Sequence, residues 1–154
     1  RRVLFRSGNK YQNMKPGDYT IGPGTHDDKS VIAQFDEHGQ RRAGVLAYDL
    51  GLNKNELESS RSKWTDAVFA ELFTTKNQFV TLPDILGSER RINEPDVQRG
   101  NWLYRANNNY KQEYFENLSK GRGLNLADAL SKALKAKGKT SPLTDNLDKY
   151  AESW

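Results

Sequence analysis

Two short segments of the chain carry side chains that could act on a polar ligand rich in hydroxyl groups. Residues 24–27 read Gly-Thr-His-Asp, residues 84–93 read Asp-Ile-Leu-Gly-Ser-Glu-Arg-Arg-Ile-Asn, and residues 100–102 read Gly-Asn-Trp. Carboxylate, imidazole, amide and guanidinium groups can hold hydroxyl groups through paired hydrogen bonds, and an indole ring offers a flat apolar face to a sugar ring. These residue types therefore favour a carbohydrate site.

The candidate residues of this site also have structural interpretations. His26 fits a polar loop, Asp27 fits a turn or a helix N-cap, and Asp84 can start a turn after the preceding proline. Residues 88–91 fit a solvated charged loop, and Trp102 fits the core. No single residue decides between the two interpretations. The full set of candidates is Asp27, His26, Asp28, Asp84, Arg91, Asn93 and Trp102.

Both segments follow residues that favour a short β-strand. Residues 19–21 read Tyr-Thr-Ile and are broken by Gly-Pro-Gly, and residues 79–82 read Phe-Val-Thr-Leu and are stopped by Pro83. In a (β/α)8 barrel, the loops that follow the strands form the active-site face. In such a fold, the two segments would lie on the same face.

The residues between the two segments have helical spacing. A helical pattern begins at Lys29, is interrupted at Gly39, and then continues to Gly51. A clearer helix follows, and Ser62 or Thr65 could supply its N-cap oxygen. Its apolar residues form one stripe, which predicts a buried face. The stripe consists of Trp64, Val68, Phe69, Leu72 and Phe73.

The C-terminal part begins with a long loop predicted over residues 87–109, and loops of this length are usually functional. Residues 110–118 predict a helix with Tyr114, Phe115 and Leu118 facing inward. A final helix is predicted from a stripe of leucines, capped by Asn125 and ended by Gly138. The leucines of that stripe are Leu126, Leu130 and Leu134.

Three regions are predicted from these patterns. Residues 1–7 read Arg-Arg-Val-Leu-Phe-Arg-Ser, which matches the translation of a common sequencing-adapter end and predicts an artefact. Residues 8–138 form the folded region, and residues 139–154 form a polar tail that is expected to fray. The formal charge of the chain is +4, and three arginines of the first region supply most of it.

Composition excludes several classes of protein. The chain of 154 residues has no cysteine, so disulfide frameworks and cysteine metal sites are excluded. No apolar run reaches the roughly 20 residues of a membrane helix, and no signal peptide is recognisable. We therefore expect a cytoplasmic protein of one globular unit without a membrane partner.

The motifs together resemble those of 4-alpha-glucanotransferases of the amylomaltase type, glycoside hydrolase family 77 in the alpha-amylase superfamily. Gly-Thr-His-Asp is similar to the end of their seventh barrel strand, the segment at 84–93 resembles their eighth-strand motif, and Gly-Asn-Trp resembles their later element. Order and spacing agree over residues 19–105. The chain departs from the family at three places. The loop before Gly87 is shorter by two residues, and Pro83 stands where the family has a glutamine. Residues 94–96 read Glu-Pro-Asp where the family usually has Pro-Gly.

The resemblance implies an α/β fold, the C-terminal portion of a (β/α)8 TIM barrel with about its last two β/α units, mostly helical by content. Asp27 would be the third catalytic carboxylate, which holds sugar hydroxyls at the transition state, and His26 would bind the same sugar. The other candidates would shape the pocket, and the resemblance implies that no metal or organic cofactor is needed. The family's nucleophile and acid/base lie upstream of the His-Asp loop, so this piece alone is expected to be inactive on its α-1,4-glucan or maltodextrin substrate.

Two other interpretations remain open at this stage. One is a glucan-binding module without catalysis. The other is a basic domain that binds nucleic acid through its lysine-rich last helix, which also fits a solvated charged face. Affinity that falls steeply with salt would favour nucleic acid, and salt-insensitive binding of maltodextrin would favour a glucan. The lysines are Lys132, Lys135, Lys137 and Lys139.

Overall fold

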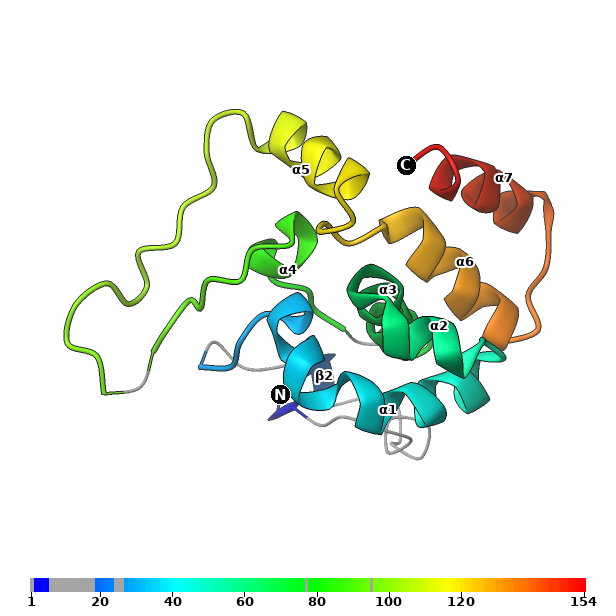
Figure 1. The fold of residues 1–154 in the computed structure, drawn as a ribbon, viewed down its shortest axis with the longest axis horizontal. Helices are drawn as coiled ribbons and strands as arrows, with labels where there is room; N and C mark the ends of the chain where they lie inside the picture. The colour runs from blue at the N-terminus through cyan, green and yellow to red at the C-terminus, as the bar shows by residue number, and fades with distance from the viewer. Residues whose placement is uncertain (1, 6–18, 24–26, 77, 95) are drawn as a thin grey trace.

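The structure is a computed structural model that describes residues 2–5, 19–23, 27–76, 78–94 and 96–154. The described part is mostly helical, with a long arm that runs from α4 to α5 (Figure 1). The elements, in chain order, are β1 (Arg2–Phe5), β2 (Tyr19–Gly22), the 3-10 helix η2 (Val31–Gln34), α1 (Phe35–Leu50), α2 (Lys54–Ser59), α3 (Arg61–Phe73), α4 (Leu82–Leu86), α5 (Tyr110–Ser119), α6 (Leu126–Ala136) and α7 (Pro142–Ala151).

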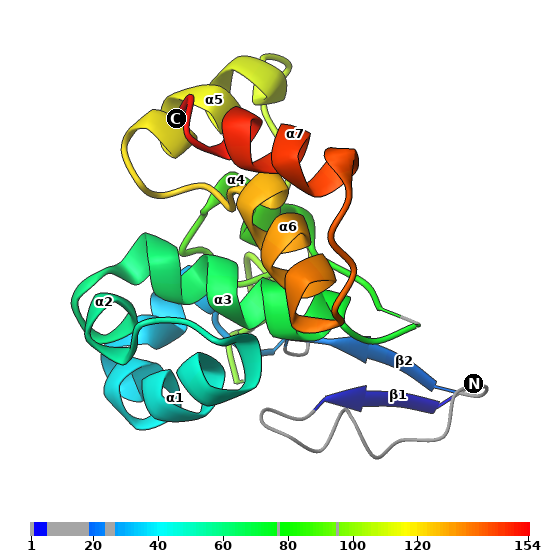
Figure 2. The same ribbon diagram turned by 90° about the vertical axis from the view of Figure 1, so that its right-hand side faces the viewer.

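The two strands lie side by side in parallel, and Arg2 pairs with Tyr19 at one end of the register (Figure 2). The strand predicted over residues 19–21 is therefore confirmed. Strand β1 falls within the segment that the sequence analysis assigned to an adapter. We predict that deletion of residues 1–7 leaves the stability of the fold unchanged.

Helix α3 lies at the centre of the hydrophobic core and packs against α1 and α6 (Figure 2). The predicted stripe is confirmed, because Trp64, Phe69 and Leu72 are almost completely buried and Phe73 packs at the edge. The ring of Phe35 meets Trp64 edge to face at 5.7 Å. Each large apolar side chain buried in this way contributes about 1.5–3 kcal/mol to the free energy of folding.

Helix α1 runs through Gly39, so the predicted interruption is wrong. The ring of Phe35 lies against this glycine, and a Cβ atom at residue 39 would approach the ring to 2.8 Å. Glycine inside a helix costs about 1 kcal/mol relative to alanine. Here the close packing of Phe35 accounts for it. The predicted end at Gly51 is confirmed, since that residue adopts a φ of 67°.

The predicted N-cap of α3 is wrong by a few residues. Ser60 accepts a hydrogen bond from the backbone N–H of Lys63, and neither Ser62 nor Thr65 is the cap. The hydroxyl of Thr65 donates instead to the carbonyl of Arg61 within the helix. The cap lies earlier because α2 ends at Ser59 and α3 begins almost at once, which the sequence analysis did not anticipate.

The strand predicted over residues 79–82 is not formed in the described chain. A single bridge occurs at Gln78, and Leu82 already belongs to α4. Thr81 caps this helix by accepting from the N–H of Asp84, and Pro83 lies in its first turn. Proline is favourable there because its missing N–H would have no partner, so Pro83 starts a helix where we had expected it to stop a strand.

The C-terminal helices differ from the prediction in two respects. Asn125 does cap α6 and Gly138 follows its end, but the residues buried on α6 are small, and Leu126 is exposed. The tail is not frayed, since α7 packs along α6 (Figure 2). A capping box between Ser141 and Thr144 starts α7, and this polar signal escaped an analysis based on apolar spacing. Helix α5 is confirmed and Leu118 is buried, but Phe115 is exposed, so its predicted inward position is wrong.

Candidate functional site

The two segments that carry the candidate residues meet in the structure. The side-chain amide of Asn93 donates a hydrogen bond of 2.5 Å to Asp27 Oδ1, across 66 residues of sequence. Asp27 follows β2, and Asn93 lies in the long loop after α4. The contact orients one carboxylate oxygen of Asp27, and both side chains are only partly buried. His26 lies outside the described residues.

Asp84, in α4, is buried. One of its oxygens accepts from the backbone N–H of Val31 at 2.8 Å, and the other accepts from the hydroxyl of Thr81 at 2.6 Å. Burial raises the pKa of this carboxyl, and the two hydrogen bonds oppose that rise. Asp84 therefore ties the start of α4 to η2, so its geometry suits positioning of the loops.

A small pocket of about 20 Å³ lies between these loops, enough for one water-sized molecule. Asp28 and Asp84 both line it, together with Gln34 and Arg90. Asp28 is exposed to solvent, whereas Asp84 is buried and lines the pocket from the protein interior. The pocket thus places two of the predicted acidic residues around one solvent-sized space.

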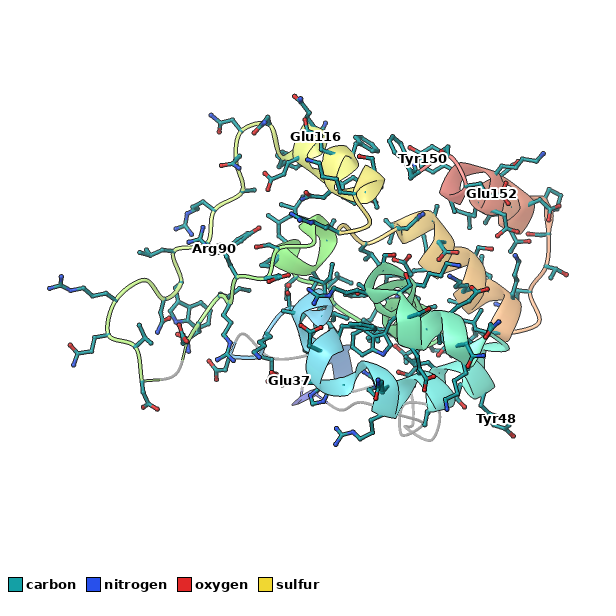
Figure 3. The ribbon with its side chains drawn as sticks, in the orientation of Figure 1. Glu37, Tyr48, Arg90, Glu116, Tyr150 and Glu152 are labelled. Carbon is teal, nitrogen blue, oxygen red and sulfur yellow. The ribbon has the colours of Figure 1, made fainter. Side chains whose placement is uncertain are left out.

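Arg91 lines a larger open groove of about 590 Å³ beside the pocket. Arg61 from the start of α3 crosses it and forms ion pairs with Asp36 at 2.8 Å and Glu89 at 3.0 Å. The label on Arg90 in Figure 3 marks the start of the arm that borders the groove. The volume falls in the range of small-ligand sites, and the lining is polar and of mixed charge.

Trp102 is exposed, with 57% of its surface accessible, so its interpretation as a core residue is wrong. Its φ is 60°, a left-handed conformation that is rare for a bulky side chain and costs on the order of 1–3 kcal/mol. Its backbone N–H donates to the carbonyl of Ile92 at 2.8 Å. The arm therefore presents the indole outward from a backbone fixed next to Asn93.

Asn101 closes the arm onto itself. Its side chain accepts from the N–H of Glu94 at 2.7 Å and donates to the carbonyls of Glu94 and Val97, each at 2.9 Å. Asn101 belongs to the Gly-Asn-Trp motif, but these contacts were not predicted from the sequence. The N-cap at Thr81 was not predicted either, although a threonine two residues before a proline is a recognisable helix N-cap signal.

The geometry suits recognition of a neutral, hydroxylated ligand. It combines an oriented carboxylate, an amide, guanidinium groups and an exposed indole within two adjoining loops. Within the described residues, no group of three or more histidine, aspartate or glutamate side chains could hold a metal ion. In the same part of the chain, no helix is long and apolar enough to cross a membrane.

Comparison with known proteins gives one informative similarity. The chain is 31% identical over 91 residues to 4-alpha-glucanotransferase DPE1, chloroplastic/amyloplastic, of Oryza sativa subsp. japonica. The match covers 57% of this chain but only 14% of the rice protein. No family model matches the chain, and no solved structure matches it significantly. The similarity supports a glucanotransferase-like relationship for the matched segment.

Proposed function

We propose that this chain is the C-terminal piece of a 4-alpha-glucanotransferase, and that its loops form part of a site for α-1,4-glucan. The hydrogen bond between Asn93 and Asp27 carries the proposal, because it joins the two motifs that the glucanotransferase resemblance pairs. The similarity to the rice enzyme supports the same relationship independently of the geometry.

In this proposal, the fold is the last two β/α units of a (β/α)8 barrel. Strand β2 precedes the loop of Asp27, and the segment before α4 precedes the loop of Asn93. Active sites of such barrels lie on the loops that follow the strands.

The proposed role of Asp27 is to hold hydroxyl groups of the sugar under attack. Asn93 orients the carboxylate through one of its oxygens, and in this proposal the carboxylate accepts from the sugar hydroxyls as positive charge develops at the transition state. A hydrogen bond that tightens at the transition state raises kcat. Retaining transfer also needs a nucleophilic carboxylate and an acid/base, which the upstream part of the parent enzyme would supply, so this chain alone would be inactive.

The other residues would shape and line the glucan path. Trp102 offers an exposed ring on which the apolar face of a glucose unit can pack. Arg91 lines the groove that leads from the site, and Asp28 lines the small pocket. Asp84 would act by positioning the loops, since both of its oxygens are engaged within the chain.

The test is Asp27→Asn in a longer protein that carries the upstream carboxylate motifs. We expect kcat on maltotriose to fall at least about 100-fold with a small change in KM, as for loss of one transition-state hydrogen bond. Asp96→Asn is the matched control, because Asp96 lies on the same arm and asparagine tolerates its positive φ. Near-normal turnover by Asp27→Asn would reduce Asp27 to a turn residue.

The alternative of a nucleic-acid-binding helix is weakened by the structure. Lys132 pairs with Asp128, Lys135 pairs with Asp148 at 2.6 Å, and Lys137 donates to a backbone carbonyl of the helical core. Ammonium groups engaged in this way neutralise little phosphate charge. The same Asp27→Asn variant distinguishes an enzyme from a binding module without catalysis. In a binding module, the variant would change the affinity for maltodextrin, and neither the variant nor the wild type would turn it over.

A further inference from the structure

A second polar pocket lies on another side of the molecule, between α3, α6 and α7. It has a volume of about 560 Å³. Asp66 lines it from α3, Asp128 and Lys132 from α6, Asp148 from α7, and Trp154 from the end of the chain. We call this space the C-terminal pocket. Its volume is of the size that holds a small organic ligand.

The C-terminal pocket is lined by five acidic and three basic side chains, and each of the three lysines pairs with a carboxylate. Lys135, for example, pairs with Asp148 Oδ2 at 2.6 Å, and Ser131 donates to the other oxygen of Asp148, also at 2.6 Å. The two carboxyl groups outside these pairs are those of Asp66 and Glu152. Paired lysines with a surplus of carboxyl groups suit hydroxyl groups, which donate to carboxylates, better than a phosphate.

Aromatic rings border the pocket and remain open to solvent. Trp154 stacks on Phe115 of α5 at 4.8 Å, and Tyr150 of α7 meets Trp154 edge to face at 6.4 Å. Trp154 is 43% exposed and Tyr150 is 55% exposed. In Figure 3, Tyr150 and Glu152 are labelled at the end of α7. Grouped aromatic rings that keep this much exposure are typical of a surface that receives a ligand.

We propose that the C-terminal pocket binds a glucose unit of an α-1,4-glucan, with the sugar face on Trp154 and its hydroxyls on the paired carboxylates and lysines. The polar and aromatic groups point to a neutral oligosaccharide, and the choice of an α-1,4-glucan rests on the proposed function. The pocket would add a second point of attachment for a chain already held near Asp27. Two linked contacts raise the effective affinity for long glucans over short ones.

The chain has three tryptophans, and each reports a different place. Trp64 is fully buried, Trp102 stands at the first site, and Trp154 borders the C-terminal pocket. We would titrate the 154-residue chain, labelled with 15N at its indoles, with maltoheptaose, and assign the three signals by single replacements with phenylalanine. The expected result is saturable movement of the Trp154 signal while that of Trp64 stays in place.

The outcomes separate this proposal from the proposed function. A shift of the Trp154 indole signal without a shift of the Trp102 signal supports binding at the C-terminal pocket and counts against the site at Asp27. A shift of the Trp102 indole signal without a shift of the Trp154 signal overturns the proposal for the C-terminal pocket but is consistent with the proposed function. If neither signal moves at millimolar maltoheptaose, the pocket proposal is overturned.

Variants provide a second measurement. Trp154→Ala should weaken binding at the pocket about tenfold through loss of the aromatic face, and Lys135→Met should weaken it roughly threefold by removing a donor while keeping the stem. Tyr48→Ala is the matched control, since Tyr48 is an aromatic residue of α1 that is 86% exposed and does not line the pocket. Unchanged affinity in Lys135→Met and Trp154→Ala, with an unchanged melting temperature, would overturn the proposal.

Discussion

The helical core and the arm that carries the candidate site hold their tryptophans in opposite ways. Trp64 is fully enclosed among α1, α3 and α6, where its burial contributes stability. Trp102 stands on an irregular loop, exposed and in a rare backbone conformation that side-chain hydrogen bonds hold in place. The core is therefore stabilised by buried apolar area, whereas the site is held by a few polar contacts. Substitutions in the two regions should therefore have separable effects.

The largest effect is expected for Trp64→Ala. Removal of a fully buried indole leaves a cavity beside Phe35 and Phe69, and such truncations cost about 3–5 kcal/mol. We expect the midpoint of urea unfolding to fall by a corresponding amount, as followed by circular dichroism. A loss below about 1 kcal/mol would show that the core described by the structure does not form.

Gly87→Ala tests the junction of the two regions and should rank second. Gly87 ends α4 at a φ of 66°, and a Cβ atom there would lie 1.9 Å from the carbonyl oxygen of Arg122. We expect a loss of about 2 kcal/mol or more, because both the conformation and the space exclude a side chain. Gly138→Ala is the matched control, since it has a similar φ of 66° but open space around it. Equal losses would mean that the contact with Arg122 is absent.

Much of the core was predictable because apolar spacing alone determines it. The stripe from Trp64 to Phe73 and the helix ends at Gly51 and Gly138 follow from local patterns. The predicted strand before Pro83 failed because β-propensity depends on neighbouring strands, whereas the cap at Thr81 is local. At the site, the motifs supplied the candidate residues, but the hydrogen bond from Asn93 to Asp27 joins distant segments and has no local signal.

Asp66 makes the stability of the core depend on pH, and the expected effect is of intermediate size. Burial and the neighbouring carboxylate of Asp128 raise the pKa of Asp66 well above its usual value of 3.8. The folded state therefore favours the protonated form, so this contribution to stability is present below pH 3.8 and is lost as pH rises through the folded-state pKa. We expect Asp66→Asn to raise the free energy of unfolding at pH 7 by about 1 kcal/mol and to flatten this pH dependence.

The geometry explains why asparagine suits this position. Its carbonyl oxygen can still accept from the backbone N–H of Asn125, as Asp66 Oδ1 does at 2.9 Å, and its amide can donate to Asp128. Thermal melts between pH 4 and pH 8 compare the melting temperatures of the wild type and Asp66→Asn. A wild-type chain whose melting temperature rises relative to Asp66→Asn over this range would contradict the assignment.

Trp102→Gly should change stability least. Relief of the strained backbone offsets the added freedom of the unfolded chain, so we expect a change within about 0.5 kcal/mol. Loss of the ring should nevertheless weaken maltoheptaose binding at the first site about tenfold. Calorimetric titration and a thermal melt of the same sample measure both quantities. A large loss of stability would place Trp102 with the core and remove the contrast with Trp64.

The long sequence separation of the site contacts has a consequence for the order of folding. Asn93 reaches Asp27 across 66 residues, and Asp84 reaches Val31 across 53. Closing such large loops costs chain entropy before either hydrogen bond can form, whereas the helices close locally within a turn. We therefore expect the site to assemble in a later kinetic phase of refolding than the formation of the individual helices. Recovery of glucan binding during refolding would then lag behind recovery of the far-ultraviolet signal.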